Sequence, residues 1–176
     1  MAGIDESIPF KALQIGILTV SDTRTTETDK SGATLRQRAE SAGHLVKEAA
    51  IVPDDYSTLV ETLQAWVARE DIDVVLTTGG TGVTGRDITP EAVLAVGDKE
   101  IPGFGELFRW LSYEKIGTST IQSRATAVVS QGTYIFALPG STGACKDAWD
   151  GILKTQLDNR FRPCNFAELL GRLQES

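Results

Sequence analysis

The sequence is poor in the residue types that most often carry metal and nucleophilic chemistry. Among 176 residues it has one histidine, His44, and two cysteines, Cys145 and Cys164. The cysteines are isolated, with no Cys-x-x-Cys pair, so the ligand pattern of a zinc site is missing. Two single cysteines are typical of buried thiols in a reducing compartment. His44 falls in a predicted strand away from the loops discussed below, and we interpret it as a structural residue.

The sequence also has no excess of positive charge and no long apolar run. Its 17 Lys and Arg against 24 Asp and Glu give a formal net charge of −7, which argues against general affinity for nucleic acid or anionic membranes. No stretch reaches membrane-spanning length, and no basic segment followed by an apolar one opens the chain. We expect a soluble, cytoplasmic protein that binds neither nucleic acid nor membrane.

Length and apolar spacing predict one α/β domain. A hydrophobic content of 41% favours a single domain at residues 13–176, after an arm at residues 1–12 that is loose or packs against another subunit. Strands are expected at residues 13–20, 44–52, 74–77, 125–129 and 133–138, and helices at 31–42, 56–69, 90–96, 104–111, 118–124, 142–157 and 165–173. The alternation of strand and helix in the first half predicts three layers, with a mostly parallel sheet between helices on both faces.

Glycine and threonine are abundant in one place, between Val74 and Pro90. There an apolar strand runs into the loop Thr-Thr-Gly-Gly-Thr-Gly-Val-Thr-Gly-Arg-Asp. Glycine permits positive φ and close approach to a ligand, and successive backbone N–H groups can form an anion-binding nest. Thr89 is expected to cap the next helix, whose N-terminus would favour phosphate. We predict a phosphate-binding loop with Asp87 beside it.

Three other interpretations of this loop fit the sequence less well. Gly80 to Gly85 matches G-x-G-x-x-G, but the dinucleotide fingerprint belongs to the first strand–helix turn, and this loop follows the third predicted strand. No Gly-Lys-Ser/Thr closes the loop, as a Walker motif requires. A tight turn without a ligand needs fewer glycines and threonines than are present.

Four loops are expected at the edge of the sheet where ligands bind in open α/β folds, beyond the carboxyl ends of the strands. They are Ser21-Asp22, Pro53-Asp54, the glycine loop and Pro139-Gly140-Ser141. Each acid in these loops could be a turn or cap residue. Together, beside a phosphate-binding loop, Asp22, Asp54 and Asp87 are better interpreted as metal ligands, and an acidic protein that binds phosphates is expected to use Mg²⁺.

These residues make the chain resemble the molybdopterin adenylyltransferase family of the MoaB/Mog type, and its bacterial MoaB branch in particular. The matches cover about residues 13–160, and Gly-Gly-Thr-Gly followed by Asp-x-Thr-Pro-Glu is the most specific. The matching segments are Ile17–Asp22, Ser31-Gly32, Val52–Asp54, Thr78–Gly82, Arg86–Ala92, Pro102–Gly105, Ser123-Arg124 and Leu138–Gly140, with Ile116–Arg124 and Phe161–Phe166 indicating the MoaB branch.

The resemblance implies a molybdopterin-binding fold and transfer of AMP from ATP to the terminal phosphate of molybdopterin, with Mg²⁺ and release of pyrophosphate. It assigns Asp54 and Asp87 as catalytic, metal-binding acids. Its substrate-binding residues are Ser21, Asp22, Gly79, Gly80, Thr81, Gly82, Ser112, Pro139, Gly140 and Ser141. It also implies a downstream molybdate-insertion protein as a partner and a homo-oligomer, either a trimer or a hexamer.

Two alternatives belong to other functional classes. The chain could be a non-catalytic relative that binds molybdopterin or a nucleotide, ATP or GTP, or it could be an oligomeric scaffold. Retention of Asp54 and Asp87 favours the enzyme, and a scaffold would leave the glycine loop unexplained.

Overall fold

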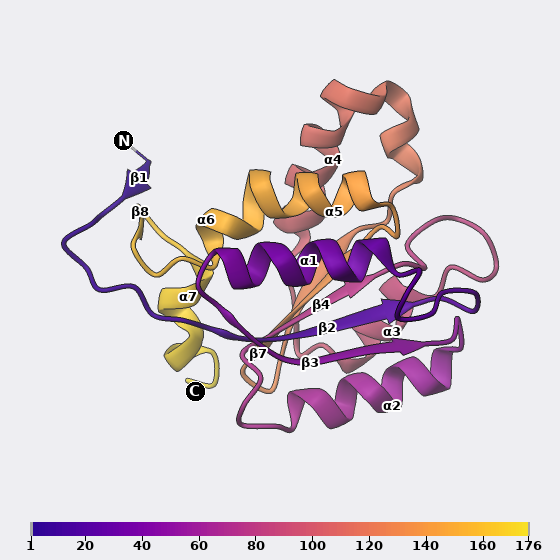
Figure 1. Cartoon of the computed structure of the whole chain (residues 1–176), viewed down its shortest axis with the longest axis horizontal. Helices are drawn as coiled ribbons and strands as arrows, with labels where there is room; N and C mark the ends of the chain where they lie inside the picture. Colours follow the sequence, from indigo (N-terminus) through magenta and orange to yellow (C-terminus); the bar gives the residue numbers. More distant parts are fainter. Residues whose placement is uncertain (1, 176) are drawn as a thin grey trace.

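A mixed six-stranded sheet forms the centre of the molecule, which the computed structural model describes over residues 2–175 (Figure 1). Its strand order is β3-β2-β4-β7-β6-β5, with the first four strands parallel and β6 antiparallel to both β7 and β5. The strands are β2 (Gln14–Val20), β3 (Leu45–Val52), β4 (Val74–Thr78), β5 (Lys99–Glu100), β6 (Thr126–Ser130) and β7 (Thr133–Leu138). The predicted mostly parallel sheet is confirmed.

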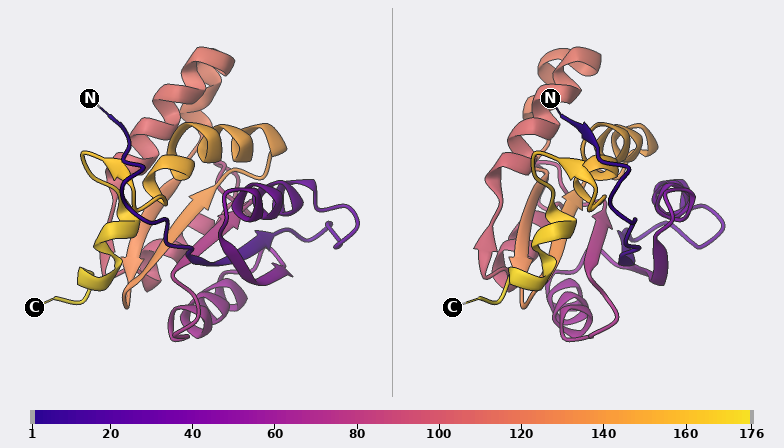
Figure 2. Two further views of the ribbon diagram at one scale, coloured as in Figure 1. Left: turned by 60° about the vertical axis from the view of Figure 1, so that its left-hand side comes forward. Right: turned by 90° about the vertical axis from the view of Figure 1, so that its left-hand side faces the viewer.

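Helices cover both faces of the sheet, which gives the predicted three layers (Figures 1 and 2). One face carries α1 (Lys30–Ser41), α4 (Pro102–Ile116), α5 (Thr142–Ala148), a π-helical turn η2 (Trp149–Leu153), α6 (Lys154–Gln156) and α7 (Phe166–Leu169). The other face carries α2 (Tyr56–Val67) and α3 (Thr89–Val96). Two short 3₁₀ helices, η1 (Gly117–Gln122) and η3 (Leu170–Arg172), follow α4 and α7.

Each element forms where its apolar spacing requires it. All five residues of β4 are buried, as expected for a parallel strand covered on both faces. In α2, Leu59, Leu63 and Trp66 recur at helical spacing and pack against the sheet. Asp55 begins this helix by accepting a hydrogen bond from the Thr58 N–H at 2.9 Å.

The connections create a crevice between β2 and β4. The helix after β2, α1, lies on one face of the sheet, and the helix after β4, α3, lies on the other. The chain therefore leaves the carboxyl ends of β2 and β4 in opposite directions, and such a switch point is where open α/β sheets bind ligands. The loops after these two strands begin at Ser21 and Gly79.

The N-terminal arm packs on its own chain, so the expectation that it is loose is wrong, while its contact with another subunit stays a prediction. Strand β1 (Gly3–Ile4) pairs antiparallel with β8 (Phe161–Arg162). The centroids of the Phe10 and His44 rings lie 5.3 Å apart. The Arg160 guanidinium lies over the same Phe10 ring, 5.1 Å from its centroid. The expectation that both cysteines are buried thiols is half right, because Cys145 is buried but Cys164 is exposed.

Several boundaries differ from the predicted ones. The helix expected at residues 104–111 begins at Pro102 and continues to Ile116. The long helix expected at residues 142–157 forms with a π-helical turn in its middle. Between residues 2 and 175, no helix combines the length and apolar character needed to cross a membrane.

Candidate functional site

The glycine loop after β4 is held in a conformation that only glycine adopts readily at two positions. Gly79 and Gly80 have φ values of 110° and 64°. A Cβ at Gly79 would lie 2.2 Å from the Val20 carbonyl oxygen, and one at Gly80 would lie 2.4 Å from the Thr89 hydroxyl. The loop therefore lies tightly against the end of β2 and the start of α3.

Thr89 fixes this loop instead of capping α3, which corrects the sequence-based expectation. Its hydroxyl donates to the Gly79 carbonyl at 2.8 Å, and its N–H donates to the Gly80 carbonyl at 3.0 Å. Helix α3 already includes Thr89, and no side chain caps its first turn. The threonine hydroxyl thus stabilises the loop itself.

Gly82 is required for a different reason. Its φ is not positive, but a Cβ there would lie 2.7 Å from Oδ2 of Asp87. The space beside Gly82 is therefore filled by the Asp87 carboxylate. A side chain at this position would displace that acid before it could reach any ligand.

Asp87 is held as a carboxylate by the loop that carries it. Its Oδ2 accepts hydrogen bonds from the Thr84 N–H at 2.9 Å and from the Thr84 hydroxyl at 2.7 Å. Burial raises the pKa of Asp87, but the hydrogen bonds from Thr84 and the Gly82 N–H, together with the charge of Arg124, outweigh it and lower the pKa. Asp87 is therefore ionised at neutral pH.

Asp54, at the end of β3, experiences the opposite balance. Burial raises its pKa, the negative charge of Asp87 raises it further, and Arg24 opposes both. Oδ1 of Asp54 lies 3.6 Å from the position that a Cβ on Gly80 would take. Asp54 and Asp87 thus face the same part of the glycine loop and repel each other electrostatically.

Asp22 does not join these two acids as a metal ligand, contrary to the sequence-based expectation. Its Oδ1 accepts the Asp54 N–H at 3.0 Å, while its own N–H donates to Oδ2 of Asp54 at 3.1 Å. Its Oδ2 forms an ion pair with Arg86. Across residues 2–175, no group of three or more His, Cys, Asp or Glu side chains is arranged to hold a metal.

A cavity of about 560 Å³ lies between these loops. It brings together nine of the predicted site residues: Ser21, Asp54, Gly79, Gly80, Thr81, Gly82, Asp87, Pro139 and Gly140. Three predicted residues do not line it. Asp22 lines the neighbouring cavity, Ser141 caps α5 by accepting the Ala144 N–H at 3.2 Å, and Ser112 is buried on α4.

Two arginines that sequence analysis assigned no role hold the walls of the cavity. Arg24 donates to the Ser31 hydroxyl at 2.5 Å and to the Gly140 carbonyl at 2.6 Å, so it links the start of α1 to the end of β7. Arg124 donates to the Gly82 and Asp87 carbonyls, each at 2.6 Å. Two features of the sequence could have pointed to these arginines. Arg24 lies two residues after the predicted Ser21-Asp22 loop, and Arg124 lies in a segment that matches the family.

Comparison with known proteins agrees with this site. Residues 16–159 match the family described as a probable molybdopterin binding domain. The chain belongs to this family, whose named members act in molybdenum cofactor biosynthesis. The match covers the glycine loop, both aspartates and the central sheet except for the first two residues of β2. The resemblance inferred from the sequence is therefore confirmed.

Individual members of the family are similar over nearly their whole length. Molybdenum cofactor biosynthesis protein B of Escherichia coli K12 is 53% identical over 160 residues, which cover 91% of this chain and 94% of that protein. A crystal structure of molybdenum cofactor biosynthesis protein B has a TM-score of 0.85 and 42% identity, covering 94% of this chain and 98% of that one. The tungsten cofactor synthesizing protein MoaB from Pyrococcus furiosus has a TM-score of 0.72 and 39% identity, with 81% and 91% covered. These structures share the molybdopterin-binding fold predicted from the sequence.

Proposed function

We propose that the protein transfers AMP from ATP to the terminal phosphate of molybdopterin and so forms adenylylated molybdopterin in molybdenum cofactor biosynthesis. Family membership supports the pathway and the pterin. The observation that supports the chemistry is that Asp54 and Asp87 line one cavity together with the loop Gly79–Gly82.

The reaction joins two anionic groups and is otherwise simple in its bond changes. A terminal phosphate oxygen of molybdopterin attacks the α-phosphorus of ATP and forms a new P–O bond. The bond from that phosphorus to the oxygen bridging to the β-phosphate breaks, and pyrophosphate leaves with the electron pair. Catalysis of such a step consists mainly of positioning and of neutralising charge.

The residues of the cavity suit this task. The glycine loop would bring backbone close to the phosphates, and the Arg24 guanidinium, held on the Gly140 carbonyl, adds a positive charge to the same cavity. Thr81 is a buried residue of the loop, and its carbonyl accepts the backbone N–H of Arg124 at 2.9 Å. The loop is therefore rigid before substrate arrives, which is what electrostatic stabilisation of a transition state requires.

Mg²⁺ fits the two aspartates. The repulsion that raises the pKa of Asp54 arises from Asp87, and a divalent cation held by both carboxylates would relieve it. Mg²⁺ is commonly bound by one or two carboxylates together with substrate phosphates. When bound, it would neutralise phosphate charge, and Asp54 and Asp87 are the side chains that would hold it.

Incubation of the protein with molybdopterin, ATP and Mg²⁺, followed by mass spectrometry, tests the proposal. We expect a pterin-AMP product and one pyrophosphate per product. Binding of both substrates without product would contradict enzymatic activity and identify the chain as the non-catalytic binding relative. The adenylylated product would next pass to a molybdate-insertion protein. Capture of that protein by the chain loaded with product would test this step.

A further inference from the structure

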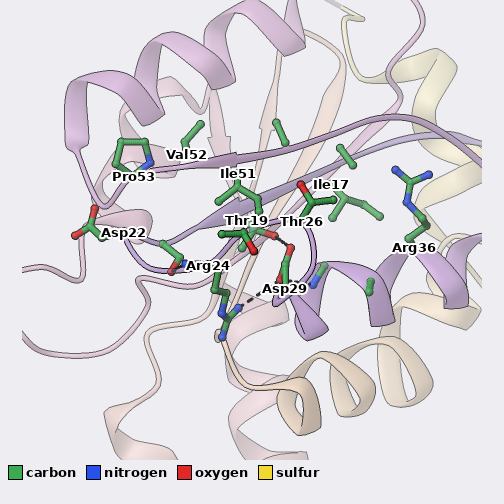
Figure 3. A pocket seen from close by; sticks show the side chains of 16 residues that line it. Ile17, Thr19, Asp22, Arg24, Thr26, Asp29, Arg36, Ile51, Val52 and Pro53 are labelled. Atoms are coloured by element: carbon green, nitrogen blue, oxygen red, sulfur yellow. Dashed lines mark hydrogen bonds and ion pairs between the residues drawn. The ribbon is translucent and has the colours of Figure 1, made fainter.

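Arg24 and Arg86 both line the cavity of the candidate site, and Arg24 is fixed there. It donates to the Ser31 hydroxyl and to the Gly140 carbonyl, and its guanidinium lies 3.6 Å from the Asp29 carboxylate. Figure 3 shows this guanidinium turned toward Asp29. Arg24 therefore supplies charge at one place and has little freedom to follow a ligand.

Arg86 is held by a single charge. Across residues 2–175, the one partner of its guanidinium is Oδ2 of Asp22, and 72% of the arginine side chain is exposed. Arg86 lies on the loop after β4 and Asp22 on the loop after β2, so their ion pair joins these two loops. Exposed ion pairs contribute little to stability, and a guanidinium has five N–H donors. Arg86 can therefore exchange Asp22 for a more highly charged partner at little cost.

The fixed side chains of the cavity do not balance the charge of a triphosphate. Asp54 and Asp87 are acids, and Arg24 already has Asp29 beside it. As the bond to the β-phosphate breaks, more negative charge develops on the departing pyrophosphate. A planar guanidinium binds two phosphate oxygens at once, and an arginine that contacts the charge of a phosphoryl-transfer transition state accelerates the reaction strongly. Arg86 directly precedes Asp87 and lines the same cavity, so its exposed guanidinium can supply that contact.

We infer that Arg86 leaves Asp22 when the nucleotide binds and places its guanidinium on the β- and γ-phosphates, where it stabilises the departing pyrophosphate. This inference rests on the proposed function, since it takes ATP as the substrate and pyrophosphate as the leaving group. Arg86 donates hydrogen bonds and forms no covalent bond in this role. Asp22 is its partner before the nucleotide binds, and so competes with the phosphates for it.

Arg86→Gln tests the contact with the phosphates. Because the side chain is exposed, the fold should tolerate the change. We expect tripolyphosphate binding, measured by calorimetry at constant Mg²⁺, to weaken about tenfold, and AMP binding to stay within about twofold, since AMP lacks the β- and γ-phosphates. Arg172→Gln is the matched control, with 66% of its side chain exposed and an ion pair to Glu175, and should change neither. Unchanged tripolyphosphate binding by Arg86→Gln, or an equal loss of AMP binding, would overturn the inference.

Asp22→Asn tests the competition for Arg86 and should act in the opposite direction. Asparagine keeps an oxygen that can accept the Asp54 N–H, as Oδ1 of Asp22 does at 3.0 Å, but it cannot form the ion pair with Arg86. We expect tripolyphosphate binding to tighten about threefold, because Arg86 no longer has to leave a carboxylate. In the Arg86→Gln background the same change should gain less, since the two residues are coupled. An equal gain in both backgrounds would show that Asp22 acts only through its charge and does not compete for Arg86.

These outcomes are separable from failure of the proposed function. If tripolyphosphate binding depends on Arg86 but the parent makes no pterin-AMP, the transferase proposal is wrong and the phosphate contact stands. If the parent makes pterin-AMP and Arg86→Gln does so at the same kcat and KM for ATP, the transferase stands and the contact is wrong. If both are right, kcat of Arg86→Gln should fall about tenfold or more, and Arg86→Lys should recover part of it by restoring the charge. A parent that binds neither ATP nor tripolyphosphate contradicts both.

Discussion

Asp54 and Asp87 line the same cavity but differ in what holds them. Asp87 accepts hydrogen bonds from Thr84 and has a lowered pKa. The pKa of Asp54 is raised, because burial and the negative charge of Asp87 outweigh the positive charge of Arg24. A pair of this kind is electrostatically prepared for a cation, because its two charges are costly without one. Perturbed carboxylates in a cavity are also the ones that most often have a function.

Asp54→Asn and Asp87→Asn should each abolish most turnover and retain pterin binding. Either change removes one negative charge facing the metal while preserving shape, and loss of one such transition-state contact typically costs about 10²–10³ in rate. The pterin phosphate should still bind, because the glycine loop is unchanged. Single-turnover formation of pterin-AMP and pterin fluorescence titration measure the two effects. Parental rates in both variants would show that these carboxylates have no part in catalysis.

His44 should make the fold sensitive to mild acid. Burial lowers its pKa below 6.5 despite the opposing charge of Asp158, and its Nδ1 accepts the Leu13 N–H at 3.1 Å. The folded chain therefore binds this proton less readily than the unfolded chain, so the stabilisation is present above about pH 6.5 and is lost as pH falls below it. The chain has one histidine, so no other imidazole contributes.

Urea denaturation at about pH 7.5 and about pH 5 measures this effect. We expect a lower midpoint at the acidic pH for the parent. His44→Asn keeps an acceptor near the Leu13 N–H but removes the titration, so the difference between the two midpoints should shrink. An equally large difference in the variant would assign the acid sensitivity to carboxylates instead.

At the scale of elements, one strand of reversed direction completes the phosphate site. Because β6 runs antiparallel to β7, its first residues lie at the edge where the parallel strands end. Arg124 stands there, just before β6, and contacts the carbonyls of Thr81, Gly82 and Asp87 as well as the Glu91 carboxylate. Arg124 thereby ties the glycine loop to the start of β6 at Thr81, Gly82 and Asp87.

Arg124→Gln should loosen this loop without unfolding the chain. A glutamine side chain is too short to reach the Gly82 and Asp87 carbonyls, so the loop loses two charge-assisted hydrogen bonds and must be ordered by the ligand. The backbone N–H of residue 124 still binds the Thr81 carbonyl. We expect tripolyphosphate binding to weaken by about tenfold and the melting temperature to change little. Arg172→Gln, which removes an exposed pair with Glu175, is the control and should leave binding unchanged. Equal binding by both variants would contradict a role for Arg124 in shaping the loop.

The sequence predicted the elements well because their signals are local. The apolar run of β4 and the helical spacing of α2 depend on neighbouring residues alone, and the edge where Ser21, Asp54 and Gly79 meet follows from strand direction. The roles of Arg24 and Thr89 could not be predicted in the same way. Each depends on a carbonyl presented by a distant strand end, Gly140 or Gly79, and thus on the final register of the sheet.

At the scale of the whole molecule, α4 and η1 leave an apolar surface uncovered. Phe104 and Phe108 turn one side of α4 to the core. The opposite side and the following 3₁₀ helix expose Leu107, Trp110, Tyr113, Ile116 and Ile121, the last with 80% of its surface accessible. A contiguous apolar surface of this kind favours association, and the predicted trimer or hexamer would bury it.

Light scattering at micromolar concentration should give the mass of a trimer or a hexamer, three or six times the 18.9 kDa of one chain. Trp110→Glu places a charge in the middle of the exposed apolar surface and should shift the mass toward that of one chain. Tyr56→Glu, on an exposed position of α2, is the control and should leave the assembly intact. A single-chain mass for the parent would remove the oligomer prediction.

The pairing of β1 with β8 also has a consequence for how the chain folds. Gly3 and Ile4 pair with Arg162 and Phe161, which lie far away along the sequence. Contacts between such distant segments form late, because the intervening chain must first be ordered. The two-stranded sheet is therefore expected to form after the central sheet. Pulse-labelling hydrogen exchange during refolding would check this order, with the amides of β4 protected before those of β1.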